Sequence, residues 1–165
     1  MTKMKGAIMF KHILVPLDGS RLSTKALPYA IELAKKFSSE ITLIRVVKPT
    51  TPLIIAEPSG MGSAATAQVA VDTARYQDKR NVLNAERYLR KQVEKCTDKG
   101  IKASSTALTG SSAESIIKHY RKNRISVVVM TTHGRSGFKR AILGSVADKI
   151  VHEPGLVAMV IHPKS

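Results

Sequence analysis

The chain has 165 residues, 43% of them hydrophobic, which suffices for one hydrophobic core but not for two. Its net charge of +15, from 27 Lys and Arg against 12 Asp and Glu, favours anionic ligands such as phosphates. The sequence has a single cysteine, no signal-peptide pattern and no apolar run of the ~20 residues that span a bilayer, so we expect one cytoplasmic domain over residues 1–165, with no membrane association and no internal disulfide.

Short β-rich runs alternate with helical patterns along the chain, which is typical of an α/β domain with a mostly parallel sheet. The run Val127-Val128-Val129-Met130 has no polar residue, and such a run predicts a strand that is buried on both faces. The five expected strands cover residues 12–17, 41–47, 101–108, 125–130 and 157–161.

The first helix is expected after the loop of residues 18–20, where Ser20 or Ser23 can cap it. Pro28 is compatible with this helix, because a proline near the first turns removes only a bond or two. Residues 48–73 interrupt the alternation of strands and helices, since they are rich in Pro, Thr, Ser, Gly and Ala. We interpret this segment as a flexible insertion.

Three further helices follow along the chain. Residues 74–99 carry apolar side chains three or four positions apart, and Cys96 falls on that apolar face, so we expect its thiol in the core. Ser111 and Glu114 have the spacing of a capping box ahead of a short helix. The last helix follows Gly144-Ser145.

Two small loops come directly after apolar strands: residues 18–20, and residues 131–137 with Gly144-Ser145 beyond them. Glycines let backbone N–H groups approach an anion, and a helix N-terminus adds partial positive charge. If the strand order is 3-2-1-4-5, the order reverses between the first and fourth strands, where open parallel sheets bind ligands. The two loops then meet, and together they predict a phosphate or nucleotide site.

Individual side chains of these loops suit different roles. Asp18 can accept hydrogen bonds from ribose hydroxyls or hold a divalent ion, although Asp also commonly begins turns. Arg135 can neutralise phosphate, and Ser145 offers a hydroxyl and an N–H at a helix start. His133 has no paired carboxylate in its motif, which favours a structural role. The sequence contains no Walker phosphate loop, no Gly-x-Gly-x-x-Gly after the first strand and no Gly-x-Ser-x-Gly elbow.

The segments Val-Pro-Leu-Asp-Gly-Ser (15–20), Thr-His-Gly-Arg-Ser-Gly (132–137) and Leu-Gly-Ser-Val-Ala (143–147) resemble the universal stress protein family. The resemblance extends over about residues 10–163. It implies a single-domain, Rossmann-like α/β fold: an open five-stranded parallel sheet of order 3-2-1-4-5 with helices on both faces. It also implies a homodimer formed through the last strand.

The nucleotide-binding branch of that family carries Gly-x-x-Gly, nine residues, and then Gly-Ser or Gly-Thr. Thr131 stands in place of the first glycine here, while Gly134, Gly144 and Ser145 match the pattern. A Cβ at Thr131 can narrow the approach to the ligand, and Gly137 can restore freedom to the loop.

The resemblance implies an ATP-binding stress-response module with little or slow hydrolysis, no assigned catalytic residue and an unidentified protein partner. AMP or ADP could replace ATP as the bound nucleotide. Mg²⁺ is a candidate ion bound together with the nucleotide, and no residue is assigned to coordinate it. An ATP-cleaving enzyme of the same broad fold and a nucleic-acid binder stay open as alternatives. The second is disfavoured because basic residues are spread along the chain without a recognisable binding motif. The implied nucleotide-binding residues are Pro16, Asp18, Val46, Thr131, Thr132, His133, Gly134, Arg135, Ser136, Gly137, Gly144, Ser145, Val146 and Ala147.

Overall fold

The computed structural model describes residues 10–52, 64–132 and 143–162, and within these ranges strands and helices alternate. All five expected strands are present, with bounds within two residues of the prediction. The strands are β1 (His12–Pro16), β2 (Glu40–Val47), β3 (Ala103–Thr109), β4 (Val127–Thr131) and β5 (Ala158–Ile161).

The strands form one parallel sheet in the order β3-β2-β1-β4-β5, which confirms the expected fold class and topology. The central β1 pairs with β2 on one side and β4 on the other. All five residues of β4 are buried, because helices cover both faces of the sheet. The order of strands reverses between β1 and β4, so the loops after these two strands open at the same edge.

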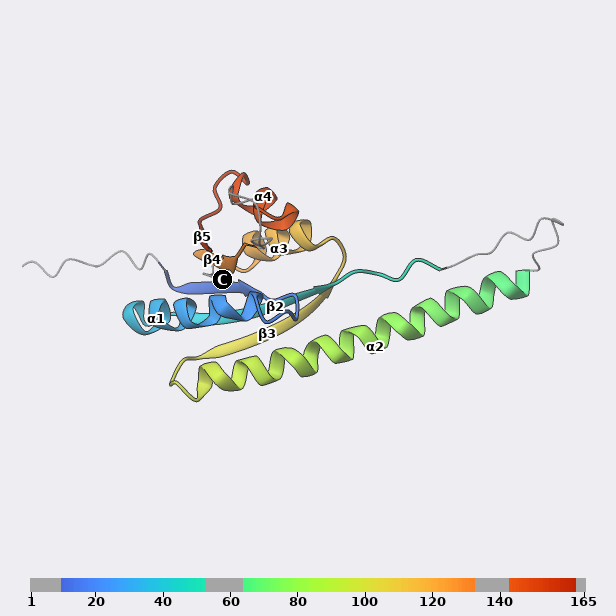
Figure 1. The fold of residues 1–165 in the computed structure, drawn as a ribbon, viewed down its shortest axis with the longest axis horizontal. Coiled ribbons are helices and arrows are strands. Elements are labelled where there is room, and N and C mark those ends of the chain that lie inside the picture. Colours follow the sequence, from blue (N-terminus) through green and yellow to red (C-terminus); the bar gives the residue numbers. More distant parts are fainter. Residues whose placement is uncertain (1–9, 53–63, 133–142, 163–165) are drawn as a thin grey trace, which may run out of the picture.

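The described residues form a short 3-10 turn and four α-helices, and the helices lie on both faces of the sheet. Figure 1 shows α1 and α2 on one face and α3 and α4 on the other. These helical elements are η1 (Ser23–Ala26), α1 (Leu27–Phe37), α2 (Ala64–Thr97), α3 (Ser112–Lys122) and α4 (Ser145–Val151). No helix among the described residues has an apolar stretch long enough to cross a bilayer.

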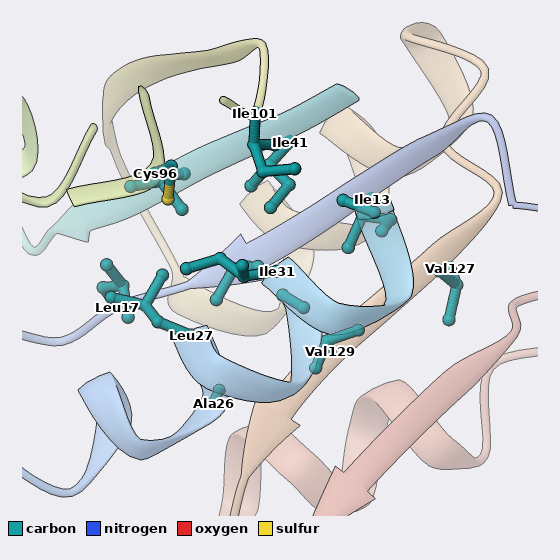
Figure 2. Close-up of a cluster of buried hydrophobic side chains, with 14 of the residues drawn as sticks. Ile13, Leu17, Ala26, Leu27, Ile31, Ile41, Cys96, Ile101, Val127 and Val129 are labelled. Carbon is teal, nitrogen blue, oxygen red and sulfur yellow. The ribbon is translucent and has the colours of Figure 1, made fainter. Parts of the chain in front are cut away.

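The sheet separates two hydrophobic clusters because successive strand residues point to opposite faces. Ile13 and Val15 of β1 pack in the cluster under α1 and α2, whereas Leu14 packs in the cluster under α3 and α4. Figure 2 shows Ile13, Ile31 and further apolar side chains gathered in the first cluster. This two-sided burial holds the strand ends, and the loops that follow them, in fixed positions.

The start of the first helical segment differs from the simple capped helix that we expected. Leu22 is at the N-cap position of the turn η1, and Ser20 fixes the first residue of the turn: the Ser23 N–H donates to Ser20 Oγ at 3.0 Å, and Ser23 Oγ donates to the Ser20 carbonyl at 3.0 Å. Helix α1 then begins at Leu27 with Pro28 in its first turn. The backbone N–H that proline lacks would have no intrahelical acceptor at this position, so no hydrogen bond is lost. Ser111 precedes α3 as predicted, but its side chain makes no capping bond.

The predicted start of the second helix was wrong by ten residues. Helix α2 begins at Ala64, so the last part of the 48–73 segment is helical, and residues 53–63 lie outside the described part of the chain. The first turns are rich in alanine, which has the highest helix propensity, yet most of their side chains are exposed. The apolar spacing that marks a packed helix is therefore weak there.

Cys96 lies fully buried in the first cluster, as the sequence predicted, and burial raises the pKa of its thiol. We expect this thiol to resist a thiol-specific reagent in the native protein, because the thiolate is the reactive form. One thiol per chain should react after denaturation in guanidinium chloride. Stoichiometric labelling of the native protein within minutes would contradict the buried position.

Candidate functional site

A cavity of about 400 Å³ opens at the carboxyl ends of β1, β2 and β4, at the point where the strand order reverses. Its volume is within the range of small-molecule sites, roughly 300–1,000 Å³. Eight of the residues selected from the sequence line this cavity: Pro16, Asp18, Val46, Thr131, Gly144, Ser145, Val146 and Ala147.

Of the remaining selected residues, only Thr132 is among those that the structure describes, and it does not line the cavity. Thr132 is buried beside β5 instead: its N–H donates to the Ile161 carbonyl at 3.0 Å, and its Oγ1 lies 2.9 Å from His162 Nδ1. Thr132 therefore links β4 to the last strand. The other five lie outside the described residues: His133, Gly134, Arg135, Ser136 and Gly137.

The loop after β1 places Asp18 at the cavity. Asp18 Oδ1 accepts a 2.8 Å hydrogen bond from the Ser20 N–H, which closes a tight turn. Gly19 in this turn has a φ of +93°, a conformation that other residues rarely adopt, and a Cβ there would come within 2.8–3.0 Å of the Arg45 guanidinium. The glycine thus lets the chain turn sharply beside Arg45 while the carboxylate stays at the strand end.

Thr131 forms the wall of the cavity at the end of β4. Its hydroxyl donates to the Leu22 carbonyl at 3.3 Å, and the residue is buried. The side chain that replaces the expected glycine therefore fastens β4 to the loop that follows β1. In the described part of the structure, Thr131 lines the cavity without filling it.

The first residues of α4 form another wall. Gly144 precedes the helix with φ −63° and ψ 156°, values that any residue can adopt. The first N–H groups of a helix have no intrahelical acceptor, so those of Ser145 and the next residues are suited to an anion. Ala147 and Ile150 are buried and pack α4 against the sheet, which fixes this wall.

Several residues that line the cavity were not predicted from the sequence. Ser112 and Ile116 come from the first turns of α3, four positions apart on one helix face. Ser23, Ile44 and Met130 complete the set, together with Leu17. The alternation of β2 and β4 could have indicated Ile44 and Met130, because both are apolar residues near the ends of central strands.

The cavity has mostly apolar walls and little acid–base capacity. Asp18 is the ionisable residue among its described lining. Next to the same loop, the Arg45 guanidinium lies 5.1 Å from the ring centroid of Tyr88, and burial raises the pKa of Tyr88 against the opposing influence of Ser23 and Arg45. Within the described ranges, no three His, Cys, Asp or Glu residues are grouped so that they could hold a metal.

The chain has clear similarity to known proteins. A model of the universal stress protein family matches residues 9–160. Universal stress protein YxiE of Bacillus subtilis (strain 168) is 31% identical over 142 residues, which cover 86% of this chain and 92% of that protein.

Solved structures share the same fold. Universal stress protein UspA from Lactobacillus plantarum superposes with a TM-score of 0.70 at 18% identity, covering 92% of this chain and 97% of that chain. The Arabidopsis thaliana family protein At3g01520, solved with AMP bound, superposes with a TM-score of 0.58 at 16% identity, covering 94% and 93%. At 16–18% identity, the similarity to these two structures shows a shared fold, that is, the same arrangement of helices and strands.

Proposed function

The chain belongs to the universal stress protein family, and from this premise we propose that it is an ATP-binding stress-response module of the cytoplasm whose nucleotide occupancy alters its conformation or its partners. The observation that supports this most is the cavity, at which Asp18, Val46, Thr131 and Ser145 meet from four separate segments. AMP bound to the Arabidopsis family member is consistent with an adenine nucleotide as ligand.

The walls of the cavity suit a nucleoside. Val46, Ile44 and Met130 offer apolar surface against which a planar base can pack. The Asp18 carboxylate lies at the end of β1, where it can accept hydrogen bonds from ribose hydroxyls. In this proposal the base lies toward β2 and the ribose toward the loop after β1.

The phosphates are proposed to lie along the start of α4, at the backbone of Gly144, Ser145, Val146 and Ala147. Residues 134–137 would complete the phosphate site, as the family motif implies. Mg²⁺ would be held mainly by the phosphates themselves, because the described residues supply Asp18 as the only carboxylate at the cavity. ADP and AMP fit the same arrangement with fewer phosphate contacts.

Slow hydrolysis is part of the proposal. A hydrolase must position and activate a water molecule, which requires a base within hydrogen-bond reach. Asp18 is the base available among the described lining residues, and one of its oxygens already accepts the Ser20 N–H. Rapid ATP turnover that is lost in Asp18→Ala would instead favour an ATP-cleaving enzyme.

The proposal can be tested on the purified protein. We expect mass spectrometry of the supernatant after denaturation to detect released adenine nucleotide, and nucleotide-free protein to bind ATP with Mg²⁺ again. Protein that carries no nucleotide and does not bind millimolar ATP would contradict the proposal. Binding to DNA or RNA with a steep salt dependence, without ATP binding, would favour the nucleic-acid alternative.

Asp18→Asn is expected to weaken ATP binding by roughly 5- to 150-fold, corresponding to about 1–3 kcal/mol for a lost charge-assisted hydrogen bond. The amide oxygen can still accept the Ser20 N–H and keep the turn, but the NH₂ group cannot accept a hydrogen bond from ribose. Calorimetric titration measures the affinity, and circular dichroism checks the fold. Equal affinity in the variant and the wild type would exclude the proposed role of the carboxylate.

We further propose a homodimer through β5, which the family resemblance implies. Strand β5 is an edge strand, and Met159 on it is 38% exposed. Sedimentation equilibrium at one protein concentration is expected to give Met159→Lys a lower average mass than the wild type, because lysine on an edge strand opposes pairing. Ser105→Lys, on the exposed part of the opposite edge strand β3, should keep the wild-type average mass. An average mass of Met159→Lys equal to that of the wild type would contradict this assignment.

A further inference from the structure

Helix α2 has a row of large exposed apolar side chains on its outer face. Val69 and Tyr76 are each 65% exposed and Leu83 is 50% exposed, and they follow one another at intervals of seven residues. The opposite face of the helix is the packed one, with Ala85 and Leu89 buried. Figure 1 shows that α2 extends past the sheet at its N-terminal end, so much of this row stands away from the rest of the domain.

Residues seven positions apart lie nearly on one line along a helix, so an apolar row with this spacing can pack along a second helix. We propose that this row binds the same row on a second copy of the chain, with the two α2 helices antiparallel and a two-fold axis at Tyr76. An axis at this position puts Tyr76 opposite itself and Val69 opposite Leu83 of the second copy. All three exposed apolar side chains are then covered by the same interaction.

The charges beside the row favour this arrangement. Asp72 and Lys79 are seven residues apart, so they lie on the same flank of the row, and both are exposed. A two-fold axis at Tyr76 brings Asp72 next to Lys79 of the second copy, and the symmetry repeats this pair. A parallel, in-register pair would instead set this flank against the opposite flank of the second copy, which places Lys79 beside Arg80.

On the opposite flank of the row, the same axis sets Thr73 beside Arg80 of the second copy. A neutral side chain then faces a cation, so no like charges meet. Asp72 already contacts Gln68 Nε2 at 3.0 Å and Arg75 Nη1 at 3.8 Å within its own helix. Both contacts are exposed to solvent and contribute little free energy, so Asp72 is able to face a further cation. This surface is separate from β5, so the contact does not depend on the proposed strand-mediated dimer or on nucleotide binding.

Disulfide cross-linking tests the geometry directly. Tyr76→Cys is expected to form a covalent dimer under mild oxidation at least about tenfold faster than Gln77→Cys, because proximity on the axis raises the effective concentration. Gln77 is the matched control, since it lies one position further along the helix and points about 100° away from the row. Cys96 is fully buried and does not compete.

The direction of the second helix is tested by mixing two variants. Val69→Cys alone and Leu83→Cys alone should not cross-link, because each cysteine lies roughly 21 Å along the axis from its counterpart. An equimolar mixture of the two should form the heterodimer. Cross-linking of Val69→Cys alone as fast as the mixture, or of Tyr76→Cys no faster than Gln77→Cys, would overturn the proposal.

A charge exchange provides an independent readout in solution. Asp72→Lys should weaken the association measured by sedimentation velocity of the Met159→Lys background, since lysine then faces lysine. The double variant Asp72→Lys, Lys79→Asp should restore it. A double variant that associates no better than Asp72→Lys alone would contradict the predicted pairing.

Discussion

Leu89→Ala is expected to lower the free energy of unfolding by about 2–5 kcal/mol, the range for removing a large aliphatic side chain from a packed core. Leu89 is fully buried and belongs to the cluster between α2 and the sheet. The vacated volume cannot be refilled easily, because β-strands and the long helix hold the surrounding side chains in place. Urea unfolding followed by circular dichroism measures the change.

Leu83→Ala is the matched control for this prediction, since it makes the same substitution in the same helix at a half-exposed position. Its effect should be within about 0.5 kcal/mol, as for most surface substitutions. Both variants should be compared at concentrations where the chain is monomeric. Equal destabilisation by the two variants would contradict the assignment of inner and outer faces to α2.

Gly144→Val is expected to abolish ATP binding, with at least about a 100-fold loss of affinity, equivalent to about 2.7 kcal/mol. Gly144 lines the cavity just before α4, so a branched side chain there competes with the ligand for space and for approach to the backbone. Its φ of −63° and ψ of 156° are compatible with valine, and the variant should therefore fold.

Gly144→Ala adds one methyl group and should reduce affinity by a smaller factor than valine. Thermal unfolding without nucleotide should give both variants a midpoint close to that of the wild type. Only the wild type should gain a large increase in that midpoint on addition of ATP, because a ligand stabilises the state that it binds. Full ATP affinity in Gly144→Val would place the ligand elsewhere on the protein.

Much of the fold was predictable because parallel strands covered on both faces are nearly continuous apolar runs. The run in β4 is the clearest example, and all five residues of that strand are buried. The start of α2 was not predictable in this way, since Val69 and Tyr76 are exposed on its outer face and obscure the inner periodicity. The extra turns of this helix are formed by residues of high intrinsic propensity rather than by core packing.

The cavity was only partly predictable. The loop after β1 and the start of α4 could be paired because strand order dictates which loops meet. Ser112 and Ile116 were missed because the place of α3 above the cavity depends on packing between distant parts of the chain. Thr132 does not line the described cavity, because it is hydrogen-bonded to Ile161 of β5 and to His162 after it. The local sequence around Thr132 does not indicate which strand it will lie beside.

The central claim is that this chain binds an adenine nucleotide at the ends of β1, β2 and β4. Calorimetric titration of nucleotide-free wild-type protein with ATP and Mg²⁺, alongside Gly144→Val, tests it most directly. We predict saturable binding of one ATP per chain to the wild type and none to the variant. Absence of binding to the wild type at millimolar ATP, or equal binding to both proteins, would contradict the account.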